Sequence, residues 1–215
     1  LDKELERRGH RFARYADDLT LLVKSRRAGE RVMASISRFL ARKLKVTVNT
    51  DKSRVVKAEE CCFLGFTFTH KRLTVSEKAL TRFKSELRRL TGRSWGVSMQ
   101  RRYGEIRTYL QGWINYFGIA LKYNDAVEID HWLRRRIRMC YWKQWRRVRR
   151  RIGELIKLGA PRYQAILTGL SRKGYWHLAK TLSMNCGLGN EFLQRQGLTS
   201  IRSLWIGIHY PAKAR

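Results

Sequence analysis

The chain has 215 residues, of which 47 are basic and 17 acidic, so its formal net charge is +30 at pH 7. An apolar fraction of 43% with seven Trp excludes a disordered polycation, and no apolar run approaches the roughly 20 residues that span a bilayer. A folded chain with this charge repels itself unless a polyanion neutralises it, which favours nucleic acid as a partner over an anionic membrane surface.

The stretch "RFARYADDLTLLV" places two adjacent carboxylates, Asp17 and Asp18, between two short apolar runs. Residues 11–15 and 19–23 have strand composition, so the segment predicts a β-hairpin with the acidic pair at its turn. One interpretation is an ordinary turn, where Asp side chains bond the backbone. The other is a Mg²⁺ site, because hard cations bind carboxylate oxygens.

The segment after the hairpin predicts one helix and several strands. Residues 27–44 carry apolar side chains every three or four positions, which predicts an amphipathic helix. Residues 45–49 alternate like a strand. Residues 61–69 predict a further strand in which Gly65 marks a bulge or a close backbone approach, with residues 71–76 pairing back onto it.

The period of the apolar pattern changes near residues 70–76, where we place the clearest domain boundary. Three amphipathic helices are predicted over 76–92, 98–120 and 124–151, joined by short connections typical of a small bundle. Beyond them, shorter helical pieces are predicted near 161–169, 173–183 and 189–196.

Residues 134–151 contain ten Lys and Arg side chains and no acidic one. On a helix, Trp142 and Trp145 share a face that we expect to be buried, while Arg138 and other arginines project elsewhere. A merely solvated face is the simpler interpretation, but ten uncompensated like charges favour contact with phosphates. The candidate RNA-binding side chains are Arg134, Arg135, Arg138, Lys143, Arg146, Arg147, Arg149 and Arg150.

The four cysteines, Cys61, Cys62, Cys140 and Cys186, form no CxxC pair, so a zinc site is not predicted. We expect reduced thiols, and a cytoplasmic protein of bacterial type. The chain opens in "LDKELERRGH", without an initiator Met, and we expect it to be part of a longer protein.

Several motifs, in order, resemble those of group II intron reverse transcriptases. "YADD" between apolar strands is similar to the polymerase active-site motif, and the helix that follows leads to an Asn-x-x-Lys-Ser signature at Asn49, Lys52 and Ser53. "FLGF" matches the block that forms the primer grip. "RRYGEIRTYLQGWINYFGIA" resembles the hallmark of the maturase domain, which doubles as the polymerase thumb. "WLRRRIRMCYWKQW", "SRKGYW" and "QGL" continue the family pattern.

This resemblance implies roles for the matching residues. Asp17 and Asp18 would bind catalytic Mg²⁺, and Tyr15 and Ala16 would lie beside the incoming nucleotide and primer end. Lys52 would sit near the nucleotide phosphates, as a proton donor to pyrophosphate. Phe63, Leu64 and Gly65 would support the primer terminus, while the simpler interpretation of Phe63 and Leu64 is strand core.

The resemblance also implies an α+β fold in three parts. Residues 1–72 would be the C-terminal part of a polymerase palm, 73–151 a three-helix thumb/maturase domain, and 152–215 the C-terminal part of the maturase domain. The implied partners are group II intron RNA, an RNA template with a DNA primer, and deoxynucleoside triphosphates. The implied activities are RNA-directed DNA synthesis and assistance to intron splicing and mobility.

Polymerases of this family use three carboxylates, and the third lies on a strand that would precede Leu1. We therefore expect the 215-residue chain alone not to polymerise DNA. Two alternatives stay open: a non-enzymatic RNA-binding splicing factor with a remnant palm, and a reverse transcriptase domesticated for another role.

Overall fold

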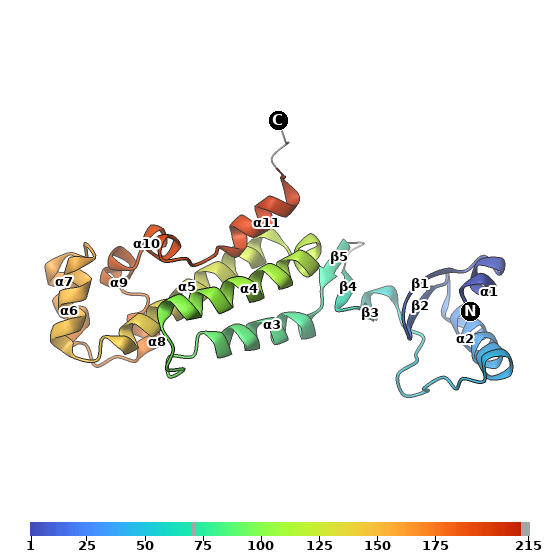
Figure 1. Cartoon of the computed structure of the whole chain (residues 1–215). Helices are drawn as coiled ribbons and strands as arrows, with labels where there is room; N and C mark the ends of the chain where they lie inside the picture. The colour runs from blue at the N-terminus through green and yellow to red at the C-terminus, as the bar shows by residue number, and fades with distance from the viewer. Residues whose placement is uncertain (70–71, 212–215) are drawn as a thin grey trace. The chain divides into compact units, whose positions relative to one another are not determined.

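The computed structural model describes residues 1–69 and 72–211, and the chain divides into two compact units, Leu1–Ser76 and Glu77–Arg215. Short antiparallel sheets belong to the first unit, whereas the described part of the second is helical (Figure 1). The predicted α+β class is confirmed. The functional boundaries after residues 72 and 151 stay predictions, since the structural division falls after Ser76. Among the described residues, no helix combines the length and apolarity needed to cross a bilayer.

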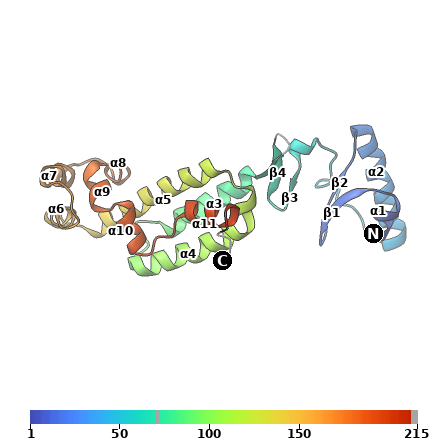
Figure 2. The same cartoon turned by 90° about the horizontal axis from the view of Figure 1, so that it is seen from above.

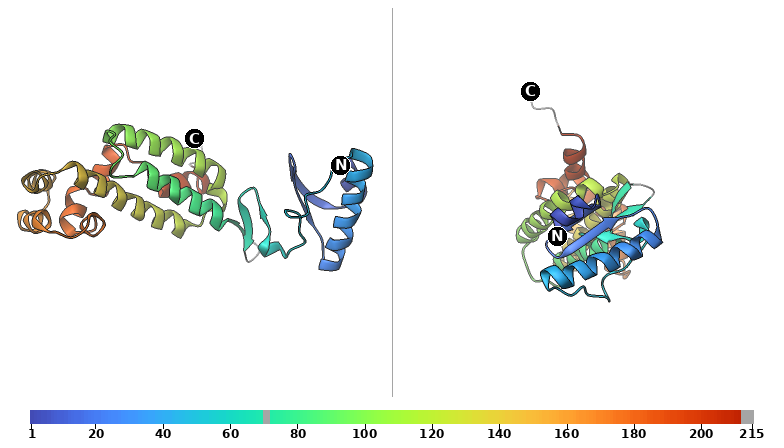
Figure 3. Two further views of the ribbon diagram at one scale, coloured as in Figure 1. Left: turned by 90° about the horizontal axis from the view of Figure 1, so that it is seen from below. Right: turned by 90° about the vertical axis from the view of Figure 1, so that its right-hand side faces the viewer.

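The first unit combines two small sheets with one longer helix. Its β1–β2 hairpin and its β3-β4-β5 sheet are both antiparallel. The helix α2 runs beside the hairpin (Figure 3), and its N-cap Ser25 accepts a hydrogen bond from the Ala28 N–H. The elements are α1 (Asp2–Arg7), β1 (Arg11–Tyr15), β2 (Asp18–Leu22), α2 (Arg26–Phe39), a π-helical turn (Leu40–Leu44), a 3-10 turn (Ala58–Glu60), β3 (Cys62–Phe63), β4 (Phe66–Thr69) and β5 (Arg72–Val75).

Two predicted strands of this unit were wrong, each because a residue adopts a left-handed backbone. Lys45 has φ +52 and ends the helical segment, so residues 45–49 form an irregular loop instead of a strand. Leu64 (φ +51) and Gly65 (φ +83) form a two-residue turn that splits the predicted strand 61–69 into β3 and β4. The returning strand is confirmed as β5, although Lys71 lies outside the described residues.

The second unit is built on three long helices that lie side by side (Figures 1 and 2), which confirms the predicted bundle. Apolar stripes on all three face one another, and Phe83 stacks on Trp113 with ring centroids 3.9 Å apart. The elements are α3 (Glu77–Leu90), α4 (Met99–Phe117), a 3-10 turn (Gly118–Ala120), α5 (Tyr123–Gln144), α6 (Val148–Lys157), α7 (Arg162–Leu170), α8 (Tyr175–Leu178), α9 (Leu182–Gly187), α10 (Asn190–Arg195) and α11 (Ile201–His209).

The predicted helix 124–151 is broken into α5 and α6, which corrects the sequence interpretation. Trp145 has φ −80 and ψ 70, and the Arg146 N–H donates to the Gln144 carbonyl at 2.9 Å. This is an inverse γ-turn. It lets Trp145 bury beside Trp142, as the sequence predicted for both indoles, and the Arg151 Nε–H holds the Trp145 carbonyl at 2.8 Å.

Asp130 of α5 forms hydrogen bonds to helix α11, which is distant from it in sequence. The residue is only 3% exposed, and its carboxylate accepts hydrogen bonds from the Ser200 hydroxyl at 2.6 Å and the Ile201 N–H at 2.8 Å. The α5 carboxylate therefore accepts from N–H groups at the start of α11, while the N-cap Ser200 accepts from the Ser203 N–H.

Replacing this carboxylate should loosen α11. We expect Asp130→Ala to lower the free energy of unfolding by about 2 kcal/mol, because the Ser200 hydroxyl and the buried Ile201 N–H lose their acceptor. Urea titration followed by far-ultraviolet circular dichroism measures the change. Glu128→Ala, an exposed carboxylate on the same helix, is the matched control and should cost under about 0.5 kcal/mol. Equal effects of both variants would contradict this role of the Asp130 carboxylate.

Candidate functional site

The acidic pair lies at the tip of the β1–β2 hairpin. Tyr15 pairs with Asp18, leaving Ala16 and Asp17 as the two turn residues. Ala16 has φ +53, a conformation that the tight turn requires but that costs an L-residue about 1 kcal/mol. Asp17 therefore lies in a short, strained turn and Asp18 at the first position of β2, and Tyr15 beside them is 66% exposed.

Neither carboxylate of the pair is neutralised by a neighbouring cation. Both are exposed, and in residues 1–69 and 72–211 no ion pair involves Asp17 or Asp18. Arg14 is engaged elsewhere: it donates to the Ala16 carbonyl at 3.0 Å and to the Asp2 carboxylate at 2.6 Å. In a chain with a net charge of +30, this leaves two accessible carboxylates side by side.

The donor set suits a hard cation in part. Two carboxylates supply oxygen ligands of the kind Mg²⁺ prefers, and an octahedral ion fills its other positions with water, phosphate oxygens or another carboxylate. The described residues bring no group of three His, Cys, Asp or Glu side chains together. The pair can therefore contribute to a magnesium site without completing it.

The other predicted polymerase residues lie on two further segments. The side chain of Asn49 accepts hydrogen bonds from the backbone N–H groups of Asp51 and Lys52, so it folds the loop that presents the exposed Lys52 ammonium. Phe63 ends β3, and Leu64 and Gly65 form the following turn, where the Gly65 carbonyl accepts from the Ser76 N–H at 2.9 Å.

The predicted RNA-binding residues separate into an anchored group and an exposed group. Arg138 was expected to project from the core, and this was wrong: it is 9% exposed and donates to the Leu188 carbonyl at 3.0 Å. Arg134 lies 3.5 Å from Asp130, and Arg135 donates twice to the Trp176 carbonyl, at 3.0 and 2.7 Å. The exposed group consists of Lys143, Arg146, Arg147, Arg149 and Arg150.

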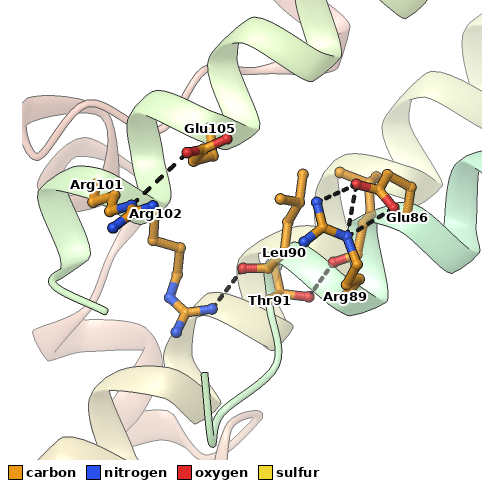
Figure 4. Close-up of polar contacts among 8 residues, drawn as sticks. Glu86, Arg89, Leu90, Thr91, Arg101, Arg102 and Glu105 are labelled. Carbon is orange, nitrogen blue, oxygen red and sulfur yellow. Dashed lines mark hydrogen bonds and ion pairs between the residues drawn. The ribbon is translucent and has the colours of Figure 1, made fainter. Parts of the chain in front are cut away.

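The maturase-like motif at the start of α4 has a structural role that the sequence did not reveal. Arg102 is 2% exposed, and its Nη1 donates to the Leu90 carbonyl at 2.5 Å, at the end of α3 (Figure 4). The guanidinium also lies over the Trp95 ring at 5.1 Å. The neighbouring Arg101 instead points to the exposed Glu105. Which arginine of a basic run is buried and which is exposed cannot be predicted from the sequence of the run alone.

Sequence reasoning also missed Lys180, Asn185 and Asn190. All three are exposed and border the same cavity as Arg134 and Arg135 of α5. They are distant from α5 in the chain, so neither spacing nor charge runs could have associated them with it.

Two family models match the chain, one over each structural unit. Residues 1–68 match reverse transcriptase (RNA-dependent DNA polymerase), and residues 80–158 match the group II intron, maturase-specific domain. Together the matches cover about two thirds of the chain. The chain belongs to the group II intron-encoded reverse transcriptase/maturases. No curated protein matches it.

Membership of this family joins reverse transcription to a function in group II intron splicing. It implies intron RNA and a nucleic-acid template as partners. The maturase match spans α3 to α6, which includes the exposed basic group between Lys143 and Arg150. The reverse transcriptase match includes the acidic hairpin.

Relieving the strain at the hairpin turn should stabilise the first unit. We expect Ala16→Gly to gain up to about 1 kcal/mol, because glycine adopts φ +53 without the steric cost of a Cβ. Slower amide hydrogen exchange in β1 and β2 would report the gain. Ala13→Gly, an exposed position inside β1, is the control and should accelerate exchange. Faster exchange in both variants would contradict the strained turn.

Proposed function

We propose that the chain binds group II intron RNA through the exposed basic group and that its acidic hairpin belongs to a magnesium-dependent polymerase centre. The maturase-specific match over the same helices that present five exposed cations carries this proposal. Its setting is the bacterial cytoplasm. Binding that favours the folded RNA over misfolded forms would assist splicing without any catalytic residue.

The basic group supports contact with a polyanion because the fold leaves most of its charge uncompensated. Arg150 lies 3.6 Å from Glu154, while the other four members make no ion pair in the described part of the chain. The γ-turn at Trp145 interrupts the helix, so Arg146 and Arg147 extend from a connecting segment. Neutralising phosphates with such side chains releases counterions and drives binding.

Removing two of these charges should weaken RNA binding and its salt dependence. We expect the double variant Arg146→Gln, Arg149→Gln to bind a group II intron RNA about tenfold more weakly at moderate salt. The slope of log Kd against log salt should fall by about 0.7 to 0.9 for each lost phosphate contact. Filter binding across a salt series measures both quantities.

The control removes equal charge from the first unit. Arg27 and Arg31 are exposed on α2, and Arg27→Gln, Arg31→Gln should reduce affinity less than the first double variant. Failure of the unmodified chain to prefer intron RNA over an unrelated RNA of equal length would contradict the proposed function. It would favour a domesticated reverse transcriptase.

For the polymerase centre, we propose that Asp17 and Asp18 hold Mg²⁺ and that Tyr15 and Ala16 flank the deoxynucleoside triphosphate and the DNA primer end. Bound magnesium would stabilise charge on phosphate oxygens during nucleotidyl transfer. Lys52 would contact the triphosphate and supply a proton to pyrophosphate. The turn formed by Phe63, Leu64 and Gly65 would support the primer terminus.

Two carboxylates without a third partner should bind magnesium but not catalyse. We expect Mg²⁺ to shift the amide resonances of residues 15–18 in NMR spectra of the chain, and Asp17→Asn, Asp18→Asn to abolish the shift. Primer extension by the 215-residue chain alone should be absent, because the described residues supply no third ligand. Magnesium-dependent extension that is lost in Asp17→Ala would contradict this.

The alternative is an RNA-binding splicing factor with a remnant palm. In this alternative the acidic pair would have no metal-binding role. An absent magnesium response in the unmodified chain, combined with retained intron RNA binding, would select this alternative.

A further inference from the structure

A basic cavity of about 390 Å³ opens on the second unit between α5 and the segments that carry α8, α9 and α10. Helix α5 contributes three guanidinium groups to its lining. Lys180 adds a fourth strong cation, and two amide side chains and the His131 imidazole complete the polar part of the wall. The four strong cations and the two amides are Arg134, Arg135, Arg138, Lys180, Asn185 and Asn190.

The fold fixes two of these arginines without neutralising them. Arg138 donates to the Leu188 carbonyl, and Arg135 donates to the Trp176 carbonyl while lying 3.7 Å above its ring centroid. Carbonyl oxygens and an aromatic face carry partial charge only. Burial, with Arg134 nearby, lowers the pKa of Arg138 to about 10, as crowded cations require.

Asp130, the carboxylate nearest to the arginines of the cavity in sequence, is already hydrogen-bonded to the start of α11. Asp130 accepts from the Ser200 hydroxyl and the Ile201 N–H, so its contact with Arg134 at 3.5 Å is long for a charge-assisted bond. Lys180 is exposed and forms no ion pair within the described residues. The cavity therefore presents positive charge that an anion from outside can satisfy.

The amides distinguish this cavity from a simple anion site. Asn185 donates its Nδ2 to the Lys180 carbonyl at 3.2 Å, which leaves its amide oxygen as an acceptor, and Asn190 is exposed at the start of α10. Amide groups can hydrogen-bond base edges and the 2′-hydroxyl of RNA. Trp176, which is not part of the lining but contacts the lining residue Arg135, is 39% exposed and is an aromatic residue of the kind on which unpaired bases stack.

We propose that this cavity binds one unpaired nucleotide of an RNA chain. Arg134 and Lys180 contact its phosphate, and Asn185 and Asn190 contact its base or ribose. A volume of about 390 Å³ lies at the small end of ligand pockets, which suits one nucleotide and excludes a duplex. The inference rests on the proposed RNA binding and adds a defined nucleotide site to it.

The test uses the full chain, labelled single-stranded RNA and free nucleoside 5′-monophosphate as competitor. Lys180→Gln should weaken RNA binding about tenfold, as the loss of a charge-assisted contact implies, and should abolish competition by the monophosphate. Asn185→Ala should weaken monophosphate binding while leaving the affinity for inorganic phosphate unchanged. Lys157→Gln removes an equal charge from an exposed site on α6 and should change either affinity less than about threefold.

The outcomes separate this inference from the general proposal. RNA binding that falls equally in Lys180→Gln and Lys157→Gln would overturn the nucleotide site while leaving the basic group as the RNA-binding surface. Competition by inorganic phosphate as strong as that by the monophosphate would reduce the cavity to an anion site and would also overturn the inference. If the unmodified chain binds no RNA, both proposals fail together.

Discussion

An excess of positive charge over the few available carboxylates is the constraint on which the helical unit depends. Part of this charge is accommodated by guanidinium groups that donate hydrogen bonds to backbone carbonyls at helix ends. Arg102 binds the Leu90 carbonyl at the end of α3, and Arg138 binds the Leu188 carbonyl just after α9. These carbonyls lack partners within their own helices and form the negative ends of helix dipoles, so they attract cations that no acidic side chain serves.

Aromatic rings accommodate further arginines of the same unit. Arg136 lies 5.2 Å from the Trp132 ring centroid, and Arg151 lies 4.7 Å from that of Trp142. Tryptophan is the best aromatic partner for a cation, so the abundant indoles stabilise arginines by cation–π contacts in addition to filling the core. Cations held by carbonyls and rings in this way stabilise the packing of the helices. Those that the fold leaves uncompensated, around the Trp145 turn and in the cavity on α5, are the ones that suit RNA.

The sequence predicted the parts of the fold that follow from local periodicity. The apolar stripes of α3, α4 and α5 identified three helices and their buried faces, and the strand composition on both sides of the acidic pair identified the hairpin. The errors came from single residues in unusual conformations. The residue types at Lys45 and Leu64 do not predict a positive φ, and the sequence around Trp145 does not predict a γ-turn.

The candidate sites show the same limit. Asp17 and Asp18 could be identified because the pair and its flanking strands are contiguous in the chain. The surface of α5 could not be sorted into buried and exposed arginines, since Arg138 is covered by Leu188 from a distant segment. The cavity could not be predicted for the same reason, because only tertiary packing brings Lys180 and Asn185 next to α5.

Lysine acylation followed by mass spectrometry, with and without bound intron RNA, tests the central claim most directly. If the uncompensated cations are the RNA-binding surface, Lys143 and Lys180 will be protected by RNA more strongly than the other exposed lysines of the helical unit, Lys157 among them. Uniform protection, or protection that spares both residues, would contradict the account.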